Sequence, residues 1–146
     1  MPYHLRVRVL PADIDELDHA NNQVYLRWVQ DAALAHSSSL GLGYPEYLAR
    51  GAAFVVRRHE IDYLRPAVEG DELDVATRVA ALGSATSERR TVIRRAGDGA
   101  LIARAVTRWA FIDLRRGRPT RIPDDIRDRY PLEPIDPDDP APDGPA

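Results

Sequence analysis

The chain has 146 residues, a formal net charge of −3 at pH 7 and 44% hydrophobic residues, which are the proportions of one globular domain. It contains no cysteine, and all 20 of its basic residues are arginine. Thiol nucleophiles, disulfides, cysteine-ligated metals and lysine Schiff bases are therefore excluded. No serine lies in a G-x-S-x-G motif. Any hydrolytic chemistry would have to use a carboxylate or an activated water.

The sequence also predicts where the protein works. No apolar run approaches the roughly 18 residues of a membrane helix, and the first residues lack the apolar core of a signal peptide. No basic stripe interleaved with aromatic residues is present, as a nucleic-acid binder would show. We therefore expect a cytoplasmic protein that binds neither membranes nor nucleic acid.

In chain order, the first expected elements are a strand and a long helix. Residues 5–10 alternate apolar and basic side chains, as in a strand with one wet face, and Pro11 ends it. Residues 24–40 carry apolar side chains at three- and four-residue spacing over most of the circumference, which predicts a helix that other elements cover. Glycines stop it, and residues 44–49 predict a further short helix.

The remainder predicts strands. They cover residues 53–64, 72–82, 87–95 and 100–112, and Gly-containing turns separate them, including a Gly-Asp-Gly hairpin at 97–99. One strand, one long helix and then four strands favour an α+β fold in which an antiparallel sheet wraps the helix. Residues 124–130 predict a last helical turn. Residues 131–146 hold half of the 12 prolines and no basic residue, so we expect a 1–130 domain with a flexible acidic tail at 131–146.

The most informative stretch is the loop before the long helix, residues 13–25, which reads DIDELDHANNQVY. It brings four acids, a histidine and two asparagines to a helix start. Asn21 or Asn22 is expected to cap the helix, and the positive end of its dipole would favour an anionic group. Taken singly, each of these side chains is more often a cap or a solvated turn residue.

The pattern D-x-D-x-x-x-H-x-N-N-x-x-Y resembles the site loop of hotdog-fold acyl thioesterases, in the acyl-CoA and acyl-ACP branch of the 4-hydroxybenzoyl-CoA thioesterase-like family. Residues 61–67, 70–73, 107–113 and 118–123 also resemble later family segments in the right order, so the resemblance covers about residues 4–130. It implies a hotdog fold, in which a curved antiparallel sheet of about five strands wraps around one long helix.

The resemblance also implies catalytic roles. Asp15 matches the family's catalytic carboxylate, which would either deprotonate a water or attack the thioester directly. His19 and Asn22 match the histidine and the second carboxamide, which would orient the water or the thioester. Backbone N–H groups at the helix start would polarise the carbonyl. Asp13 is expected to be structural, because Asx side chains commonly cap their own loop.

Four further residues are candidates for binding substrate or coenzyme A: Tyr25, Gln30, Ser87 and Arg89. Tyr25 matches a family position, although its place on an apolar helix face is more typical of the core, and at Gln30 relatives usually carry an acid. The arginine pairs 57–58, 89–90 and 94–95 are candidates for the coenzyme A phosphates, or else for the solvated face of a strand. Ser87 and Arg89 lie near the turn that often borders the ligand in relatives.

The resemblance implies hydrolysis of an acyl-CoA to free acid and coenzyme A, with no metal and no cofactor beyond the coenzyme A of the substrate. Alternatives are an acyl-ACP thioesterase that docks an acyl carrier protein, a non-catalytic acyl-CoA-binding hotdog protein and, last, a hotdog hydratase. Plant acyl-ACP thioesterases carry Asn where this chain has Leu17, so no named substrate is transferred. A homodimer or homotetramer is implied, with sheets joined edge to edge.

Overall fold

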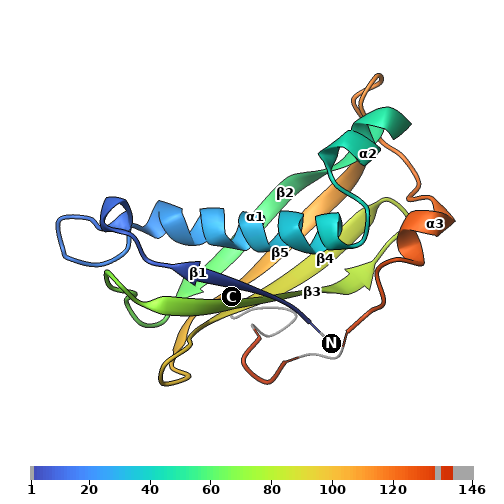
Figure 1. Ribbon diagram of the computed structural model, residues 1–146. Coiled ribbons are helices and arrows are strands. Elements are labelled where there is room, and N and C mark those ends of the chain that lie inside the picture. The colour runs from blue at the N-terminus through green and yellow to red at the C-terminus, as the bar shows by residue number, and fades with distance from the viewer. Residues whose placement is uncertain (1, 134–135, 140–146) are drawn as a thin grey trace.

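The computed structural model describes residues 2–133 and 136–139. Their helices and strands follow in chain order (Figure 1): β1 (Tyr3–Arg8), a 3-10 turn η1 (Pro11–Asp13), α1 (Asn22–Ser39), α2 (Tyr44–Arg50), β2 (Ala52–Tyr63), β3 (Glu72–Leu82), β4 (Thr86–Arg95), β5 (Leu101–Asp113), β6 (Arg118–Pro119) and α3 (Asp124–Arg127).

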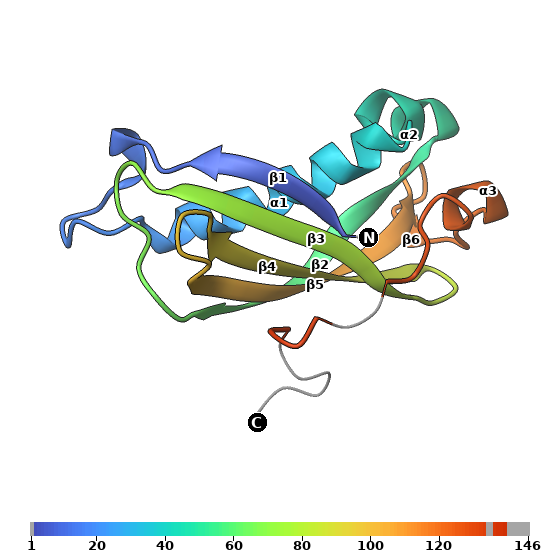
Figure 2. The same cartoon turned by 60° about the horizontal axis from the view of Figure 1, so that its bottom comes forward.

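The strands form one antiparallel sheet in the order β1-β3-β4-β5-β2, and the short β6 pairs with β5. The sheet is strongly curved, and α1 lies along its concave face (Figures 1 and 2). This arrangement confirms the predicted α+β hotdog fold. The first strand differs from its prediction: it covers 3–8 rather than 5–10, because its pairing with β3 ends at Arg8 opposite Glu72. β6 was not predicted.

The helix α1 forms where the spacing of apolar residues predicted it. Asn21 caps it, since its side chain accepts a hydrogen bond from the backbone N–H of Gln23 at 2.9 Å. At the other end Gly41 adopts a left-handed φ of 76°, which stops the helix at little cost. The face turned to the sheet is buried and consists of Tyr25, Trp28, Val29, Ala32 and Ala33.

A buried polar layer divides the core into two apolar clusters. One cluster packs under the N-terminal half of α1 and includes Trp28, Val75 and Ile93. The other lies beyond its C-terminal half and includes Tyr47 and Phe111. Between them, the concave face of the sheet carries these polar side chains: His59, Thr77, Arg89, Thr91 and Thr107.

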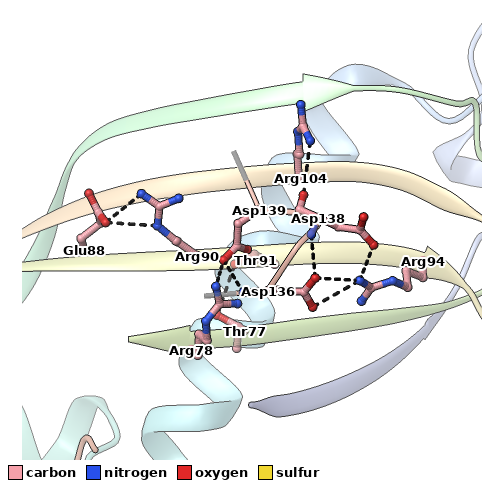
Figure 3. Close-up of polar contacts among 10 residues, drawn as sticks. All are labelled: Thr77, Arg78, Glu88, Arg90, Thr91, Arg94, Arg104, Asp136, Asp138 and Asp139. Carbon is pink, nitrogen blue, oxygen red and sulfur yellow. Dashed lines mark hydrogen bonds and ion pairs between the residues drawn. The ribbon is translucent and has the colours of Figure 1, made fainter. Parts of the chain in front are cut away.

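The C-terminal residues 136–139 contact the convex face of the sheet, opposite α1 (Figures 2 and 3). Asp136 and Asp138 bind Arg94 on β4, with the shortest oxygen–nitrogen distances at 3.1 and 2.6 Å. Asp139 pairs with Arg78 on β3, and both residues are buried, at 7% and 3% exposure. For these residues the structure differs from the expected solvated tail. Residues 134–135 and 140–146, on which the rest of that prediction falls, lie outside the described part of the chain.

The Asp139–Arg78 contact predicts that the C-terminal residues contribute to stability. Replacing Asp139 with Ala removes the partner of a buried guanidinium, so we expect a loss of about 1–3 kcal/mol in the free energy of unfolding, measured with urea. Asp128→Ala, at an exposed position, serves as the control and should change little. Equal stability of the two variants would show that residues 136–139 do not hold this position in solution.

Candidate active site

The loop that precedes α1 is a tight hairpin. Ile14 and Ala20 form an isolated antiparallel bridge, and the N–H of Asp15 donates to the carbonyl of His19 at 2.9 Å. The turn closes with a hydrogen bond from the N–H of Asp18 to the carbonyl of Asp15 at 3.1 Å. Asp18 has a φ of 61°, a left-handed conformation that Asp tolerates better than most residues. The hairpin therefore brings the backbones of Asp15 and His19 opposite each other.

Two buried side chains fix this hairpin to the rest of the molecule. Asp13 is only 4% exposed and accepts hydrogen bonds from the N–H of Leu10 and the guanidinium of Arg27, both at 2.9 Å. Its partners are thus structural, as expected for this residue. Tyr25 is also buried, and its hydroxyl accepts from the N–H of Ala67 at 3.0 Å, while the carbonyl of Ala67 accepts from the N–H of Ala20 at 2.8 Å.

Asp15 is half-buried at the rim of an open depression. One of its carboxylate oxygens accepts from the N–H of Leu17 at 2.9 Å, which fixes the side chain. The depression is lined by Ile14, Asp15, Glu16, Leu17 and Asn21. Among the described residues the Asp15 side chain is bound through this oxygen only, so its second oxygen can bind a water or a substrate.

His19 and Asn22 lie close to Asp15 along the same loop, and both side chains are exposed. Within the described residues, no hydrogen bond joins the side chains of Asp15, His19 and Asn22 to one another. The structure therefore gathers the three predicted catalytic residues on one loop without fixing a catalytic hydrogen-bond chain. Their roles stay predictions.

The first turn of α1 begins directly behind this loop. Asn21 binds the N–H of Gln23 through its side chain and that of Val24 through its carbonyl. The N–H of Asn22 has no acceptor among the residues that the structure describes. A free N–H at the positive end of a helix dipole is a donor for developing negative charge on a thioester oxygen.

The remaining predicted binding residues divide into two groups. Tyr25 is a core residue, and Gln30 is half-buried on α1 with no side-chain hydrogen bond among the described residues. Neither lines the depression beside Asp15. Ser87 and Arg89, in contrast, line a second and deeper cavity, so a binding role for them fits the geometry.

That cavity lies at the C-terminal end of α1, between α1, α2 and the sheet. Because a helix rises 1.5 Å per residue, His36 is about 20 Å along α1 from Asn22. The cavity and the Asp15 loop of one chain thus occupy opposite ends of the helix (Figure 1). The cavity is lined by Ala33, Leu34, Ser37, Ser38, Leu42, Gly43, Tyr44, Tyr47, Ala53, Phe54, Val79, Leu82, Ser87, Arg89, Trp109 and Tyr130.

Arg89 is the charged residue of this cavity. It is 4% exposed, and its Nη1 donates to His36 Nδ1 at 2.9 Å and to the hydroxyl of Thr77 at 3.1 Å. Burial lowers the pKa of Arg89 to about 10, so the guanidinium is still charged at neutral pH. Arg89 is therefore buried, whereas an arginine that binds the phosphates of coenzyme A was expected at the surface.

His36 accepts the hydrogen bond from Arg89 as a neutral imidazole. Burial, and then the positive charge of Arg89, lower the pKa of His36 from 6.5 to about 4, and Glu133 opposes this more weakly. The ring is also stacked on Tyr3, with centroids 5.4 Å apart. His36 lies three and four residues after the buried Ala33 and Ala32, so helical spacing puts it on the same face, but spacing along the helix does not show its partner on β4.

A signal for the polar layer was present in the strand pattern. Side chains alternate between the two faces of a strand, and Ser87, Arg89 and Thr91 are each an even number of residues from Ile93 on β4. They therefore lie on the same face as Ile93, which is in the core. Polar residues at positions that should be apolar often mark functional sites. Arg90 and Arg94 lie on the other face of β4, where Arg90 binds Glu88 and Arg94 binds Asp136.

Neither a metal-binding cluster nor a membrane-spanning helix is found in the described part of the chain. No three His, Asp or Glu side chains of these residues gather as a metal site would require. None of the helices that they form combines the length and the apolar character that crossing a bilayer demands.

The fold and the Asp15 loop together define a hotdog protein of the thioesterase type. The model of the thioesterase-like superfamily matches residues 9–130, so the chain belongs to this family. The match spans α1 and every strand except β1, and it includes both the loop with Asp15 and the cavity with Arg89.

Two curated relatives are similar to the chain. The long-chain acyl-CoA thioesterase FadM of Escherichia coli is 27% identical over 127 residues, which cover 85% of this chain and 93% of FadM. A chloroplastic acyl-[acyl-carrier-protein] hydrolase of Cuphea viscosissima is 30% identical over 114 residues, or 74% of this chain. The match spans only 28% of that plant protein.

A solved structure agrees with both the fold and the family. A thioesterase from Thermus thermophilus, complexed with coenzyme A and Zn, is 30% identical to this chain with a TM-score of 0.75. The alignment covers 87% of this chain and 90% of the Thermus protein.

The lowered pKa of His36 predicts a pH dependence of stability. The unfolded chain binds a proton at His36 near pH 6.5 and the folded protein only near pH 4, so the free energy of unfolding should fall as the pH drops through this range. Urea unfolding at pH 7, 6 and 5 measures this. His36→Gln should lose less stability than wild type between pH 7 and 5. Parallel profiles for wild type and His36→Gln would contradict the assignment.

Proposed function

We propose that the protein hydrolyses acyl-CoA thioesters at the loop that carries Asp15. The observation that supports this most directly is the position of Asp15: a half-buried carboxylate with one oxygen held by the N–H of Leu17, in the hairpin before α1 and beside the same depression as the N-cap residue Asn21. The family match supports the class of reaction, and the relation to FadM and to a thioesterase that binds coenzyme A supports the choice of acyl-CoA.

The reaction needs a nucleophile and a polarised carbonyl. In one route, the Asp15 carboxylate takes a proton from a water, whose oxygen attacks the thioester carbon. The C–S bond then breaks, and the leaving thiolate takes up the proton. In the other route, Asp15 attacks the carbonyl itself, releases the thiolate and forms a mixed anhydride that water hydrolyses. In both routes the N–H of Asn22 would donate to the carbonyl oxygen, and the side chains of His19 and Asn22 would orient the water or the thioester.

Assembly of two subunits would complete this site. The depression beside Asp15 is open in a single chain. The twelve-residue strand β2 pairs with β5 on one side, and among the described residues nothing pairs with its other edge. An unpaired edge of this length favours pairing with another strand, so we propose a homodimer or homotetramer joined through β2. A cytoplasmic location stays a prediction of the sequence.

The second candidate is an acyl-ACP thioesterase. The observation that favours it is the 30% identity to the plant acyl-[acyl-carrier-protein] hydrolase. Comparison of kcat/KM for the same acyl group on coenzyme A and on acyl carrier protein separates the two candidates. A preference for the carrier-bound form would replace our choice of substrate while leaving Asp15 in its role.

The central prediction concerns Asp15. In Asp15→Asn the side chain keeps its size but is neither a base nor a good nucleophile, so kcat for acyl-CoA should fall by about 100-fold or more. Thiol release, followed with a thiol-reactive dye, is the measurement, and the absence of cysteine keeps the protein itself unreactive. Short, long and aromatic acyl-CoAs form the panel.

Asp18→Asn is the matched control, because Asp18 lies in the same hairpin three residues away and its side chain is exposed. It should keep kcat within a few-fold of wild type. Full activity of a folded Asp15→Asn variant would exclude the proposed mechanism. Binding of acyl-CoA without turnover by wild type would favour a non-catalytic acyl-CoA-binding protein.

A further inference from the structure

The cavity at the C-terminal end of α1 contains a buried cation without a matching anion. Arg89 donates to neutral groups, His36 and Thr77, and no carboxylate lies within ion-pair distance of it among the described residues. An arginine buried to this extent is normally paired, because removing its charge from water is costly. Arg78, which is buried to a similar extent at 3% exposure, follows that rule and pairs with Asp139. Arg89 thus lacks the partner that its burial calls for.

Apart from Arg89, the polar side chains that line the cavity are hydroxyls and one indole N–H. The cavity lining includes the hydroxyls of Ser37, Tyr47 and Tyr130 and no Asp or Glu. The hydroxyl oxygens of Ser37 and Tyr130 lie 2.6 Å apart, and those of Tyr130 and Tyr47 lie 3.4 Å apart. Burial raises the pKa of the Tyr47 hydroxyl, so it keeps its proton at neutral pH. A cation beside protonated hydroxyls is complementary to an anion with several acceptor oxygens.

Two more features of the cavity support an anion as its ligand. The indole N–H of Trp109, another residue of the lining, is buried and has no acceptor among the described residues. The last carbonyls of α1, which would repel an anion, already accept hydrogen bonds. The carbonyl of Ser37 accepts from the N–H groups of Leu40 and Leu42, and the carbonyl of Ser38 accepts from the N–H of Gly41. The end of the helix therefore presents few acceptors to the cavity.

The rest of the lining is apolar and selects the kind of anion. Ala33, Leu34, Leu42, Ala53, Phe54, Val79 and Leu82 form its walls. A phosphate group is strongly hydrated and doubly charged, and in this lining the single guanidinium of Arg89 would oppose its two charges. A carboxylate carries a single charge, matches the fork of a guanidinium and can be attached to an apolar chain that these walls accept.

We propose that this cavity binds the carboxylate of an apolar carboxylic acid, with Arg89 as its counter-ion and the hydroxyls of Ser37, Tyr47 and Tyr130 as further donors. The choice of ligand rests on the proposed function, which supplies such a carboxylate from two sources. One is the free acid released by hydrolysis, and the other is a second carboxylate at the far end of a dicarboxylic acyl group.

The first test measures binding without turnover. Octanoate and octanol have the same chain, but only octanoate is an anion, so wild type should bind octanoate at least about 10-fold more tightly by calorimetry at pH 7. Arg89→Gln should weaken octanoate binding by about 10- to 100-fold and leave octanol binding nearly unchanged. Arg108→Gln is the control for loss of one positive charge, because Arg108 lies on the neighbouring strand β5, is 42% exposed and is not part of the lining.

Two results would overturn the proposal. One is equal binding of octanoate and octanol by wild type, a comparison that needs no variant and holds even if Arg89→Gln fails to fold. The other is unchanged octanoate binding by a folded Arg89→Gln. Asp15→Asn should bind octanoate like wild type. If wild type hydrolyses no thioester, the proposed function fails while the octanoate measurements still decide whether the cavity binds carboxylates.

Kinetics then identify the source of the carboxylate. If it is the far end of the acyl group, kcat/KM should be at least about 10-fold higher for hexadecanedioyl-CoA, whose chain can span the roughly 20 Å between the Asp15 loop and the cavity, than for palmitoyl-CoA, and Arg89→Gln should remove that preference. If it is the released acid, octanoate should inhibit the wild type, and Arg89→Gln should resist inhibition by about 10-fold or more. The absence of both effects would contradict a role for this cavity in the reaction.

Discussion

Burial of α1 against the concave face of the sheet is the constraint on which the other features depend. The buried residues of the helix lie on one face, and the sheet curves around that face to remove Trp28, Val29 and Ala32 from water. The curvature places the two ends of the helix in different surroundings. The N-terminal end meets the polar hairpin with Asp15, and the C-terminal end meets α2 and the cavity with Arg89.

The polar layer under α1 is an exception to the rule that a core is apolar. Three threonines, His59 and Arg89 take inward positions that aliphatic residues would fill more favourably. The threonines satisfy one another or a neighbour, as in the hydrogen bond between Thr91 and Thr77 at 3.2 Å. Arg89 has neutral partners only, and its charge stays uncompensated by the described residues. A protein keeps so costly an arrangement where it serves binding, which is why we assign this cavity a ligand.

The arginines on the two faces of the sheet have different kinds of partner. On the concave face Arg89 lies in a cavity without an acid. On the convex face Arg78 and Arg94 bind carboxylates of residues 136–139, and Arg90 binds Glu88 (Figure 3). The acidic C-terminal residues thus neutralise arginines that would otherwise cover the outside of the sheet with positive charge. Adjacent arginines of one pair, such as Arg89 and Arg90, therefore have unrelated roles.

The sequence by itself determined the features that depend on local order. Helix periodicity, the capping carboxamide Asn21 and the glycine turns placed α1 and the strands β2 to β5 to within a residue or two, and β3 agreed at both ends. The loop of Asp15, His19 and Asn22 could also be predicted as a site from the sequence, because its residues lie close together in the chain; their roles stay predictions. The tertiary structure alone decided which face of β4 meets the helix, that His36 and Arg89 touch across 53 residues, and that Asp139 reaches Arg78. These contacts depend on how distant segments pack, and alternation along one strand shows which side chains share a face but not what lies opposite them.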